Sequence, residues 1–244
     1  MILLDSNEKI LVIGHRGANN IAPENTLKSF KKAIELGADY IEFDIHQSKD
    51  GEIVIMHDAN TYNTTGHKGL IKRMTLKELK ELDCGEGERI PTLQELIKIA
   101  KYNIGLQIEI KAKGMAEKLV ELLRKEDLIE SSIISSFLHE ELLNIQKIEP
   151  KLKLATLEPI ISNPSKNWDY HLEILNKVIN NKYFAIHPRY QLVNKRLINY
   201  AHDNNIKVNI WTVNSKAWMK KFIKKGVDGL ITDNIQNAKD VLKR

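Results

Sequence analysis

The sequence predicts an α/β protein built as a TIM (β/α)8 barrel with a small insertion after its second strand. Short β-branched runs alternate with amphipathic helical patterns along the whole chain, which is typical of βαβ units and a parallel sheet. The 244 residues, 42% of them hydrophobic, suffice for one such domain. No linker or repeat divides the chain, so we expect a single domain over residues 1–244. A doubly wound open sheet is the alternative.

Nine segments have the composition of strands. In chain order they are Ile10–His15, Asp39–Ile45, Ile53–His57, Ile104–Ile110, Ser132–Phe137, Lys153–Leu157, Tyr183–His187, Lys207–Val213 and Asp228–Thr232. An eight-stranded barrel has room for all but one of them. The hairpin signal Asp50-Gly51 accounts for the extra strand, because no helix lies on either side of it. The third segment should therefore pair antiparallel with the second. If those two residues form the turn, His57 lies directly opposite Asp44.

The helices are predicted from apolar residues at helical spacing. In the first, Thr26–Leu36, an apolar stripe ends before Gly37. The others are Leu93–Lys101, Ala116–Lys125, Glu140–Ile148, Tyr170–Asn180, Lys195–Asn204, Lys216–Lys225 and Ile235–Leu242.

Residues 59–89 do not fit the alternation of strands and helices. They are rich in glycine and asparagine and hold one helical fragment near Thr75–Leu82. Leu70, Ile71, Met74 and Leu79 can pack, so we interpret the segment as an inserted cap over the barrel mouth.

Composition excludes several classes of protein. The single Cys84 cannot form an internal disulfide. The start of the chain, Met1–Lys9, is too short and too acidic for a signal peptide, and no apolar run approaches the ~20 residues that span a bilayer. We expect a cytoplasmic protein, monomer or homodimer, without integral membrane association.

The net charge of +5 raises the question of a nucleic-acid partner. Most lysines alternate with acidic residues. We interpret the densest cluster, Lys220, Lys221, Lys224 and Lys225, as a solvated helix face. No base-stacking aromatic array accompanies it, so we expect no nucleic-acid partner.

Three carboxylates fall at alternating strand positions. Glu42 and Asp44 alternate with apolar residues in one strand, and Glu109 does so in another. Both faces of a barrel strand are enclosed, so these side chains should point into the interior near the C-terminal mouth. Like charges held there repel one another unless a cation lies between them. Oxygen ligands without cysteine favour Mg²⁺ or Ca²⁺ over zinc. The alternative is a solvated face of antiparallel strands.

Two histidines and an arginine lie beside these carboxylates. His15 ends the first strand, and the hairpin brings His57 to Asp44. Imidazole titrates near neutral pH, so the pair suits a general acid and a general base. Either could instead be a core histidine or a metal ligand. Arg16 can present its planar fork to a phosphate or carboxylate, or be an unpaired surface residue. The remaining histidines outside strand ends are interpreted as surface or cap residues: His46, His67, His139, His171 and His202.

Further candidates lie at the edges of this cluster. Asn25 or Thr26 is a natural N-cap for the first helix. Capping does not explain Glu24, which could accept hydrogen bonds from the neighbouring arginine or from a ligand hydroxyl. Trp211 and Phe137 are each either core fillers or walls of a ligand pocket.

Together these segments resemble the glycerophosphodiester phosphodiesterase family. The matching stretches run in the family's order: His15-Arg16-Gly17, Ala22-Pro23-Glu24-Asn25-Thr26, Gly37–Ile45, Lys49-Asp50-Gly51, Val54–Asp58, Pro91-Thr92-Leu93, Glu109-Ile110-Lys111, Ser135-Ser136-Phe137, Trp211-Thr212-Val213-Asn214 and Asp228–Asp233. The resemblance covers the chain from about Ile10 to Asp233, and its N-terminal block is the most specific part.

The resemblance implies a TIM barrel that hydrolyses glycerophosphodiesters, such as glycerophosphocholine or glycerophosphoethanolamine, to sn-glycerol 3-phosphate and an alcohol. It also implies a bound Ca²⁺ or Mg²⁺ and a place in lipid and glycerol metabolism. By the same resemblance, each site residue has a role: Glu42, Asp44 and Glu109 bind the metal, His15 and His57 are the acid–base pair, Arg16 and Lys111 hold the phosphate, Glu24 and Asn25 order the site or touch metal and glycerol, and Phe137 and Trp211 line the glycerol side.

Two other functions are compatible with the same residues. A lysophospholipase D would need a wide apolar mouth, and the polar cap favours short water-soluble diesters instead. A non-catalytic barrel that binds a phospho-ligand would not need both histidines and all three carboxylates. The sequence does not assign the acid and the base between the histidines. The nucleophile is either water or the glycerol 2-hydroxyl, acting through a cyclic phosphate.

Overall fold

The computed structural model describes residues 9–161, 164 and 167–244. Eight parallel strands form a ring in which β1 pairs with both β2 and β9. The strands are β1 (Leu11–His15), β2 (Tyr40–Gln47), β4 (Gly105–Ile110), β5 (Ser132–Ser136), β6 (Lys153–Glu158), β7 (Ala185–Pro188), β8 (Lys207–Ile210) and β9 (Gly229–Thr232). The ring is the predicted TIM barrel, and the open sheet is excluded because its edges pair with each other.

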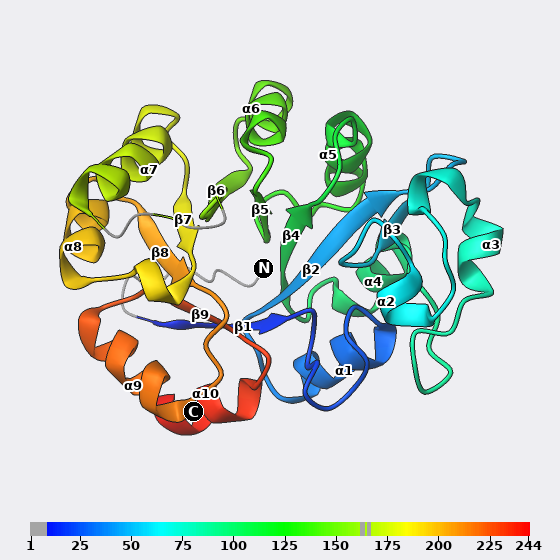
Figure 1. The fold of residues 1–244 in the computed structure, drawn as a ribbon, viewed down its shortest axis with the longest axis horizontal. Coiled ribbons are helices and arrows are strands. Elements are labelled where there is room, and N and C mark those ends of the chain that lie inside the picture. The colour runs from blue at the N-terminus through cyan, green and yellow to red at the C-terminus, as the bar shows by residue number, and fades with distance from the viewer. Residues whose placement is uncertain (1–8, 162–163, 165–166) are drawn as a thin grey trace.

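Each barrel strand in the described residues is followed by a helix on the outside of the ring (Figure 1). These helices are α1 (Leu27–Glu35), α4 (Leu93–Ala100), α5 (Ala116–Lys125), α6 (His139–Ile148), α7 (Trp168–Asn180), α8 (Lys195–Asp203), α9 (Lys216–Lys225) and α10 (Ile235–Leu242), and a 3₁₀ turn, η2 (Tyr190–Leu192), precedes α8. Their predicted ends agree with the structure within two residues. Capping boxes at Thr26 and Thr92 fix where α1 and α4 begin.

The alternation along the strands separates two layers of core. The outward side chains of β2 and β4 pack against the helices in the main hydrophobic cluster; among them, Phe43 meets Phe30 of α1 edge to face at 5.9 Å. The inward side chains fill the lower barrel: Ile13, Tyr40, Ile133, Ala155, Ala185 and Ile231. Glu42 and Asp44 lie on the inward side of β2, so the barrel interior changes from apolar to charged along one strand.

The short strand β3 (Ile53–Ile55) pairs antiparallel with β2, as the hairpin signal predicts, but the predicted register is wrong by one residue. Ile45 lies opposite Ile55. The turn is a three-residue loop, Lys49–Gly51, rather than a two-residue one, and Gly51 adopts a left-handed φ of 85°. A third loop residue in this conformation is typical of a type I turn followed by a bulge.

The shifted register moves His57 beyond the end of the sheet. Met56 takes the place opposite Asp44 and donates its N–H to the Asp44 carbonyl at 3.0 Å. The carbonyl of His57 then lies 3.2 Å from Nε2 of His46. His46 and His171 are both buried, so their interpretation as surface residues is wrong.

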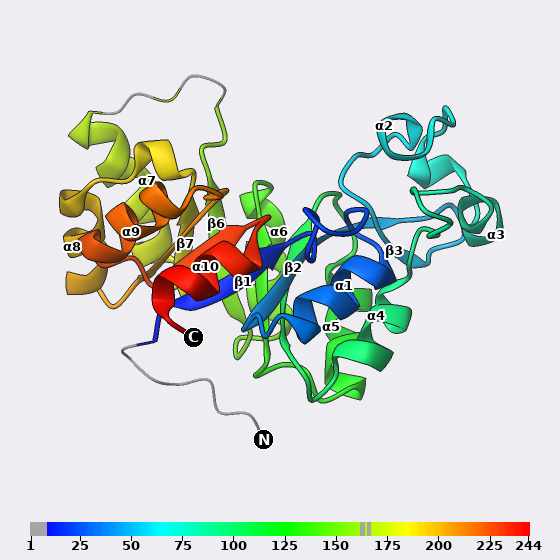
Figure 2. The same cartoon turned by 90° about the horizontal axis from the view of Figure 1, so that it is seen from below.

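Residues 59–89 pack beside β3 through a small core of their own. They include the helices α2 (Tyr62–Thr65) and α3 (Leu76–Lys80) and the 3₁₀ turn η1 (Ile71–Arg73), which lie at one end of the molecule in Figure 2. Ile71, Leu79 and Cys84 bury their side chains against the β3 hairpin. The apolar residues of this segment therefore have a packing role.

In the part of the chain that the structure describes, no helix combines the length and the apolar character needed to cross a bilayer. Met1–Glu8, on which the expectation about a signal peptide rests, lie outside the described residues.

We expect Phe43→Ala to lower the free energy of unfolding by about 3–5 kcal/mol, because it removes a fully buried ring between barrel and helices. Urea unfolding measures this. Leu143→Ala is the control. Leu143 of α6 is 38% exposed, so its substitution should lower the free energy of unfolding by less than about 1 kcal/mol. Equal losses in the two variants would contradict this account of the core.

Candidate active site at the barrel mouth

The centre of the site is a group of three buried carboxylates. Glu42 and Asp44 project from β2, and Glu109 projects from β4, directly beside Asp44 in the sheet register. Their exposed fractions are only 3%, 1% and 7%. One oxygen from each carboxylate lies within 4.8 Å of the others. The structure therefore brings together the three residues that the sequence predicts as metal ligands.

The pKa values of this group show that burying three negative charges together is unfavourable. Burial, reinforced by the charge on Asp44, raises the pKa of Glu42 to about 7 and that of Glu109 to about 8. Burial also acts on Asp44, but Lys111 and Arg16 outweigh it and lower its pKa. Near pH 7, Glu42 and Glu109 therefore retain protons that solvent-exposed carboxylates have lost.

The donor set fits a hard divalent cation. All three groups are oxygen ligands, and a cation–oxygen distance of about 2.4 Å places opposite oxygens about 4.8 Å apart. The spread of the three oxygens is compatible with that shell. A buried acidic triad of this kind could hold a metal ion, which would replace the protons on Glu42 and Glu109.

Arg16 joins the first strand to the carboxylates. Its Nη1 donates to both oxygens of Glu24 at 2.9 Å, and its backbone N–H donates to Glu42 at 2.9 Å. Its Nε lies 3.6 Å from Asp44. Burial alone would lower the pKa of Arg16, but the charges of Asp44 and Glu24 raise it. The predicted contact between Glu24 and the arginine is confirmed.

Lys111 supplies a second positive charge from the end of β4. Its Nζ lies 2.8 Å from Glu109 and 3.5 Å from Asp44. The same nitrogen lies 6.0 Å from the centre of the Phe137 ring. Burial lowers the pKa of Lys111, but the two carboxylates outweigh it and raise the pKa. Lys111 is therefore a stable cation within reach of the carboxylate group.

Asn25 contacts the cluster directly. Its Nδ2 donates to Asp44 at 2.9 Å from a buried position, and its backbone has a left-handed φ of 56°. Thr26, and not Asn25, is the N-cap of α1, because its hydroxyl accepts from the N–H of Ser29. The structure thus separates the two residues that the sequence left as alternatives for the cap.

His15 lies at the end of β1, in register with Glu42 of β2. Its Nδ1 is 2.6 Å from Oδ1 of Asp233. Burial lowers the pKa of His15, but the Asp233 hydrogen bond and the charge of Glu42 outweigh it and raise the pKa overall. Burial raises the pKa of Asp233, but the hydrogen bond and charge of His15, together with hydrogen bonds from Asn214 and Asn19, outweigh it and lower the pKa overall. An ionised carboxylate only accepts, so Nδ1 carries the proton and Nε2 is the nitrogen left for chemistry.

His57 has the opposite electrostatic surroundings. Burial lowers its pKa, and the charges of Lys111 and Arg16 act in the same direction, against Asp44. Its Nδ1 lies 2.8 Å from Asp58, which in turn accepts from Asn63 of α2 at 2.7 Å. The pKa of His15 is therefore raised, which favours its protonated form, whereas the pKa of His57 is lowered, which favours its neutral form.

Asp233 and its partners are site residues that were not predicted from the sequence. Asn19 donates to Oδ1 of Asp233 at 2.9 Å, and Asn214 donates to Oδ2 at 2.5 Å. A signal was available: Asp233 follows β9 with the same parity as Ile231, whose side chain faces the barrel interior. These three residues fix the orientation of the His15 ring.

Phe137 and Trp211 meet across the mouth. Their rings form an edge-to-face pair with centroids 5.7 Å apart. Trp211 donates its Nε1–H to the carbonyl of His187 at 2.8 Å, and both aromatic side chains are half-buried. They line the side of the mouth next to Lys111 rather than fill the core completely.

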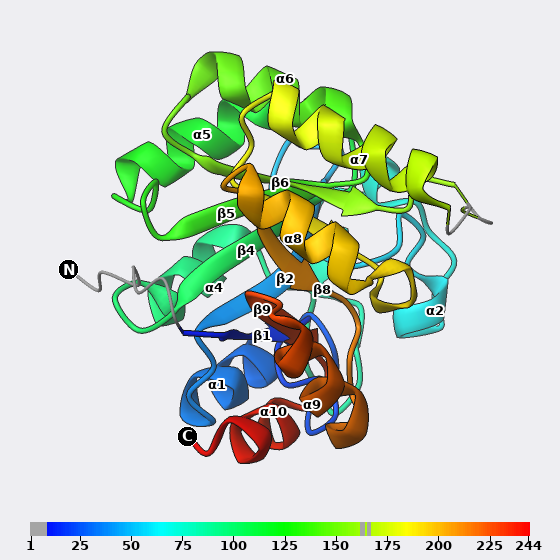
Figure 3. The same cartoon turned by 90° about the vertical axis from the view of Figure 1, so that its left-hand side faces the viewer.

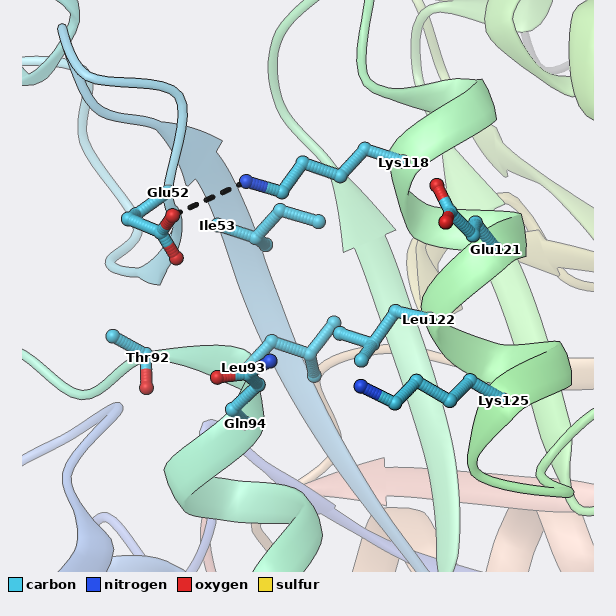
Figure 4. Close-up of a pocket in the computed structure, with 9 residues that line it drawn as sticks. All are labelled: Glu52, Ile53, Thr92, Leu93, Gln94, Lys118, Glu121, Leu122 and Lys125. Carbon is cyan, nitrogen blue, oxygen red and sulfur yellow. Dashed lines mark hydrogen bonds and ion pairs between the residues drawn. The ribbon is translucent and has the colours of Figure 1, made fainter.

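A groove of about 170 Å³ lies elsewhere, on the outside of the barrel between the β3 hairpin, α4 and α5 (Figure 4). Figure 4 shows Lys118 reaching Glu52 across it. None of the predicted site residues lines it. The candidate site is instead the mouth, where the other eight predicted residues lie around the three carboxylates.

Comparisons with known proteins place the chain among enzymes that cleave phosphodiesters. Residues 15–237 match the glycerophosphoryl diester phosphodiesterase family. A glycerophosphodiester phosphodiesterase from Caldanaerobacter subterraneus is 37% identical over 97% of this chain and 99% of its own. A phosphodiesterase from Oleispira antarctica, solved in complex with the product sn-glycerol-3-phosphate, has a TM-score of 0.83 and 30% identity over 96% of this chain and 97% of its own. A glycerophosphodiester phosphodiesterase from Thermotoga maritima has a TM-score of 0.80 and 28% identity over 98% of this chain and all of its own.

Divalent cation binding should release about one proton at pH 7, because the raised pKa values of Glu42 and Glu109 leave protons that a cation displaces. The release should vanish well above pH 8, where both groups are already ionised. Titration calorimetry with Mg²⁺ or Ca²⁺ in buffers of different ionisation enthalpy measures it. Asp44→Asn should lose binding, whereas the control Glu52→Gln, outside the mouth, should not. Binding without proton release at pH 7 would contradict the proposed protonation of the cluster.

Proposed function

The chain belongs to the glycerophosphoryl diester phosphodiesterase family and is a phosphoric diester hydrolase; from that premise we propose that it hydrolyses glycerophosphodiesters to sn-glycerol 3-phosphate and an alcohol in a metal-dependent reaction. Glycerophosphocholine and glycerophosphoethanolamine are the proposed substrates. The observation that carries the proposal is the group of three buried carboxylates flanked by two histidines of opposite pKa shift. The sn-glycerol-3-phosphate bound in the Oleispira antarctica enzyme supports the proposed product.

Mg²⁺ or Ca²⁺ would be held by Glu42, Asp44 and Glu109, whose oxygen donors suit either ion. When bound there, the cation supplies positive charge against the phosphate oxygens and so favours nucleophilic attack on phosphorus. Asn25 keeps the Asp44 carboxylate in place through its 2.9 Å hydrogen bond.

The protein's own cations bind the phosphate. Arg16 and Lys111 both lie next to Asp44, Arg16 at 3.6 Å from one carboxylate oxygen and Lys111 at 3.5 Å from the other, so two positive charges flank the carboxylate group. Charge that develops on the phosphate oxygens in the transition state meets donors that are already oriented. Glu24 holds Arg16 by two hydrogen bonds, which limits the freedom of the guanidinium. Phe137 and Trp211 form the apolar wall against which the glycerol carbons pack.

We assign the general acid to His15 and the general base to His57. Asp233 stabilises the protonated form of His15, which can give its Nε2 proton to the leaving alkoxide. His57 is neutral at pH 7, because burial and the charges of Lys111 and Arg16 disfavour its cation. It takes the proton of the nucleophile, water or the glycerol 2-hydroxyl.

The segment over residues 59–89 acts as the cap in this proposal. Asn63 of α2 holds Asp58, and Asp58 holds His57, so the cap is linked to the base by two hydrogen bonds. Its position next to His57 suits a role in ordering the base.

The purified protein with Mg²⁺ or Ca²⁺ should release sn-glycerol 3-phosphate from glycerophosphocholine, and EDTA should abolish the release. An enzyme-coupled glycerol 3-phosphate assay measures it. Lysophosphatidylcholine, tested side by side, should be cleaved at least about tenfold more slowly, a difference of ~1.4 kcal/mol in transition-state binding. Faster cleavage of the lysophospholipid would favour the lysophospholipase D function instead.

His15→Ala and His57→Ala should each lower kcat by about 10²–10⁴-fold, the contribution typical of a positioned acid or base. In the control variant His67→Ala, an exposed histidine of the cap is removed, and kcat should stay unchanged. In a kcat/KM profile, the base should titrate at lower pH than the acid, as the directions of the two pKa shifts require. Full activity of the double alanine variant would remove both assignments.

A further inference from the structure

The positive charge of the chain is concentrated in one part of the sequence. Between Glu173 and Asp228 it has eleven lysines and arginines and a single acidic residue, Asp203. That stretch carries a formal charge of +10, whereas the whole chain carries only +5, so the rest of the molecule is acidic by five charges. Such asymmetry within a chain suggests an anionic partner.

The fold gathers this charge on one side of the barrel. The stretch contains β7, β8, α8 and α9, and Figure 3 looks onto α8 with α7 and α9 beside it. The Lys195 ammonium at the start of α8 donates to the carbonyl of Lys225 at the end of α9, at 2.9 Å. The two helices therefore share one outer surface.

Three lysines on the exposed face of α9 have no carboxylate partner among the described residues, whereas Lys216 at the start of the helix pairs with Asp240. Lys220, Lys221 and Lys224 are exposed, and none of them forms an ion pair with any residue that the structure describes. Other exposed lysines differ: Lys28 pairs with Glu86, and Lys113 pairs with Glu140. Burial and the charge of Lys221 lower the pKa of Lys225. The charge of Lys220, Lys221 and Lys224 is thus uncompensated among the described residues.

An aromatic side chain projects from the same face. Trp218 is 41% exposed and stacks on the buried Phe222 with centroids 5.9 Å apart. The Lys221 ammonium lies 4.3 Å from the centre of the Trp218 ring. A tryptophan among lysines on an exposed amphipathic helix is typical of a membrane interface, where the indole lies among headgroups and the lysines meet anionic lipids.

We propose that the α8–α9 surface, made of Trp218, Lys220, Lys221 and Lys224 with Lys195 of α8, docks the enzyme on an anionic phospholipid bilayer. An RNA partner fits this surface less well. Trp218 is the one aromatic side chain that the structure shows as exposed on α8 and α9, whereas single-stranded nucleic acid is bound by successive stacking platforms.

The α8–α9 surface begins next to the candidate active site. Tyr190 packs on Trp218 with centroids 5.7 Å apart, and its backbone N–H donates to the carbonyl of Trp211 at 2.8 Å. Trp211 lines the mouth. A bilayer bound at this surface would therefore lie beside the entrance of the barrel, close to where phospholipid breakdown produces water-soluble diesters. The inference goes beyond the proposed reaction and does not depend on it.

Co-sedimentation with vesicles tests the proposal. The whole chain should bind vesicles of phosphatidylcholine with about 30% phosphatidylglycerol at low salt and leave them in about 0.5 M NaCl, because screening weakens exposed charges. Pure phosphatidylcholine vesicles should bind far less protein. The triple variant Lys220→Gln, Lys221→Gln, Lys224→Gln should bind anionic vesicles about 100-fold more weakly, from about fivefold per lysine.

A matched control removes three other exposed lysines. Lys31→Gln, Lys98→Gln, Lys147→Gln lowers the charge equally, on α1, α4 and α6, and should keep vesicle binding within about twofold of the unaltered chain. Trp218→Ala should weaken binding to anionic vesicles without any change in charge. All variants should keep the far-ultraviolet circular dichroism spectrum and the cooperative thermal unfolding of the unaltered chain, which report that they fold.

Several results would overturn the proposal. One is equal loss of vesicle binding in the two triple variants, which would indicate net charge and not this surface. Another is the absence of binding to anionic vesicles. Tight binding of a single-stranded RNA in place of the vesicles would overturn the proposal in the same way. Since salt release and lipid preference are measured on the unaltered chain, the proposal remains falsifiable if a variant fails to fold. Failure of vesicle binding leaves the hydrolysis assay unaffected, so the two proposals are tested separately.

Discussion

The mutual repulsion of three buried carboxylates is the constraint on which the rest of the mouth depends. Parallel pairing of β2 with β4 sets Asp44 beside Glu109, and the two-residue period of β2 adds Glu42 on the same inward face. Water reaches these groups poorly, so their charges must be balanced by protein cations, protons or a metal. Arg16 and Lys111 stabilise the ionised form of Asp44, whereas Glu42 and Glu109 retain protons near neutral pH. Such a site could hold a divalent cation in place of these protons, and we propose that a phosphate then binds between that cation and the two basic side chains.

The same charges account for the difference between the histidines. His15 lies among anions, since Asp233 holds its Nδ1 and Glu42 is its neighbour across the sheet. Burial and the positive charges of Lys111 and Arg16 lower the pKa of His57, although the charge of Asp44 acts in the opposite direction. The surroundings thus shift the pKa values of two identical side chains in opposite directions. Enzymes obtain a general acid and a general base at one pH in this way.

Most of the fold and most of the candidate site could be predicted from the sequence, because the patterns that indicate them lie within short segments. Alternation in the second strand placed Glu42 and Asp44 on one face, and all nine strands and the helices of the barrel repeat were located within a few residues. The hairpin register could not be predicted, since it depends on Gly51 adopting a left-handed conformation that adds one residue to the turn. Asp233 was missed because its partner, His15, is 218 residues away in the sequence, and only barrel closure between β9 and β1 brings them together. The burial of His46 likewise follows from the hairpin packing and not from its own sequence context.

We propose that the carboxylates, the two cations and the histidines form one site for a metal and a phosphate. A crystal structure of the protein with Ca²⁺ and sn-glycerol 3-phosphate tests it most directly, with the cation identified by its anomalous signal. We expect one cation bound by Glu42, Asp44 and Glu109. We also expect a phosphate that contacts this cation, Arg16 and Lys111, with the histidines on either side. A cation bound elsewhere, or a phosphate remote from both histidines, would contradict it.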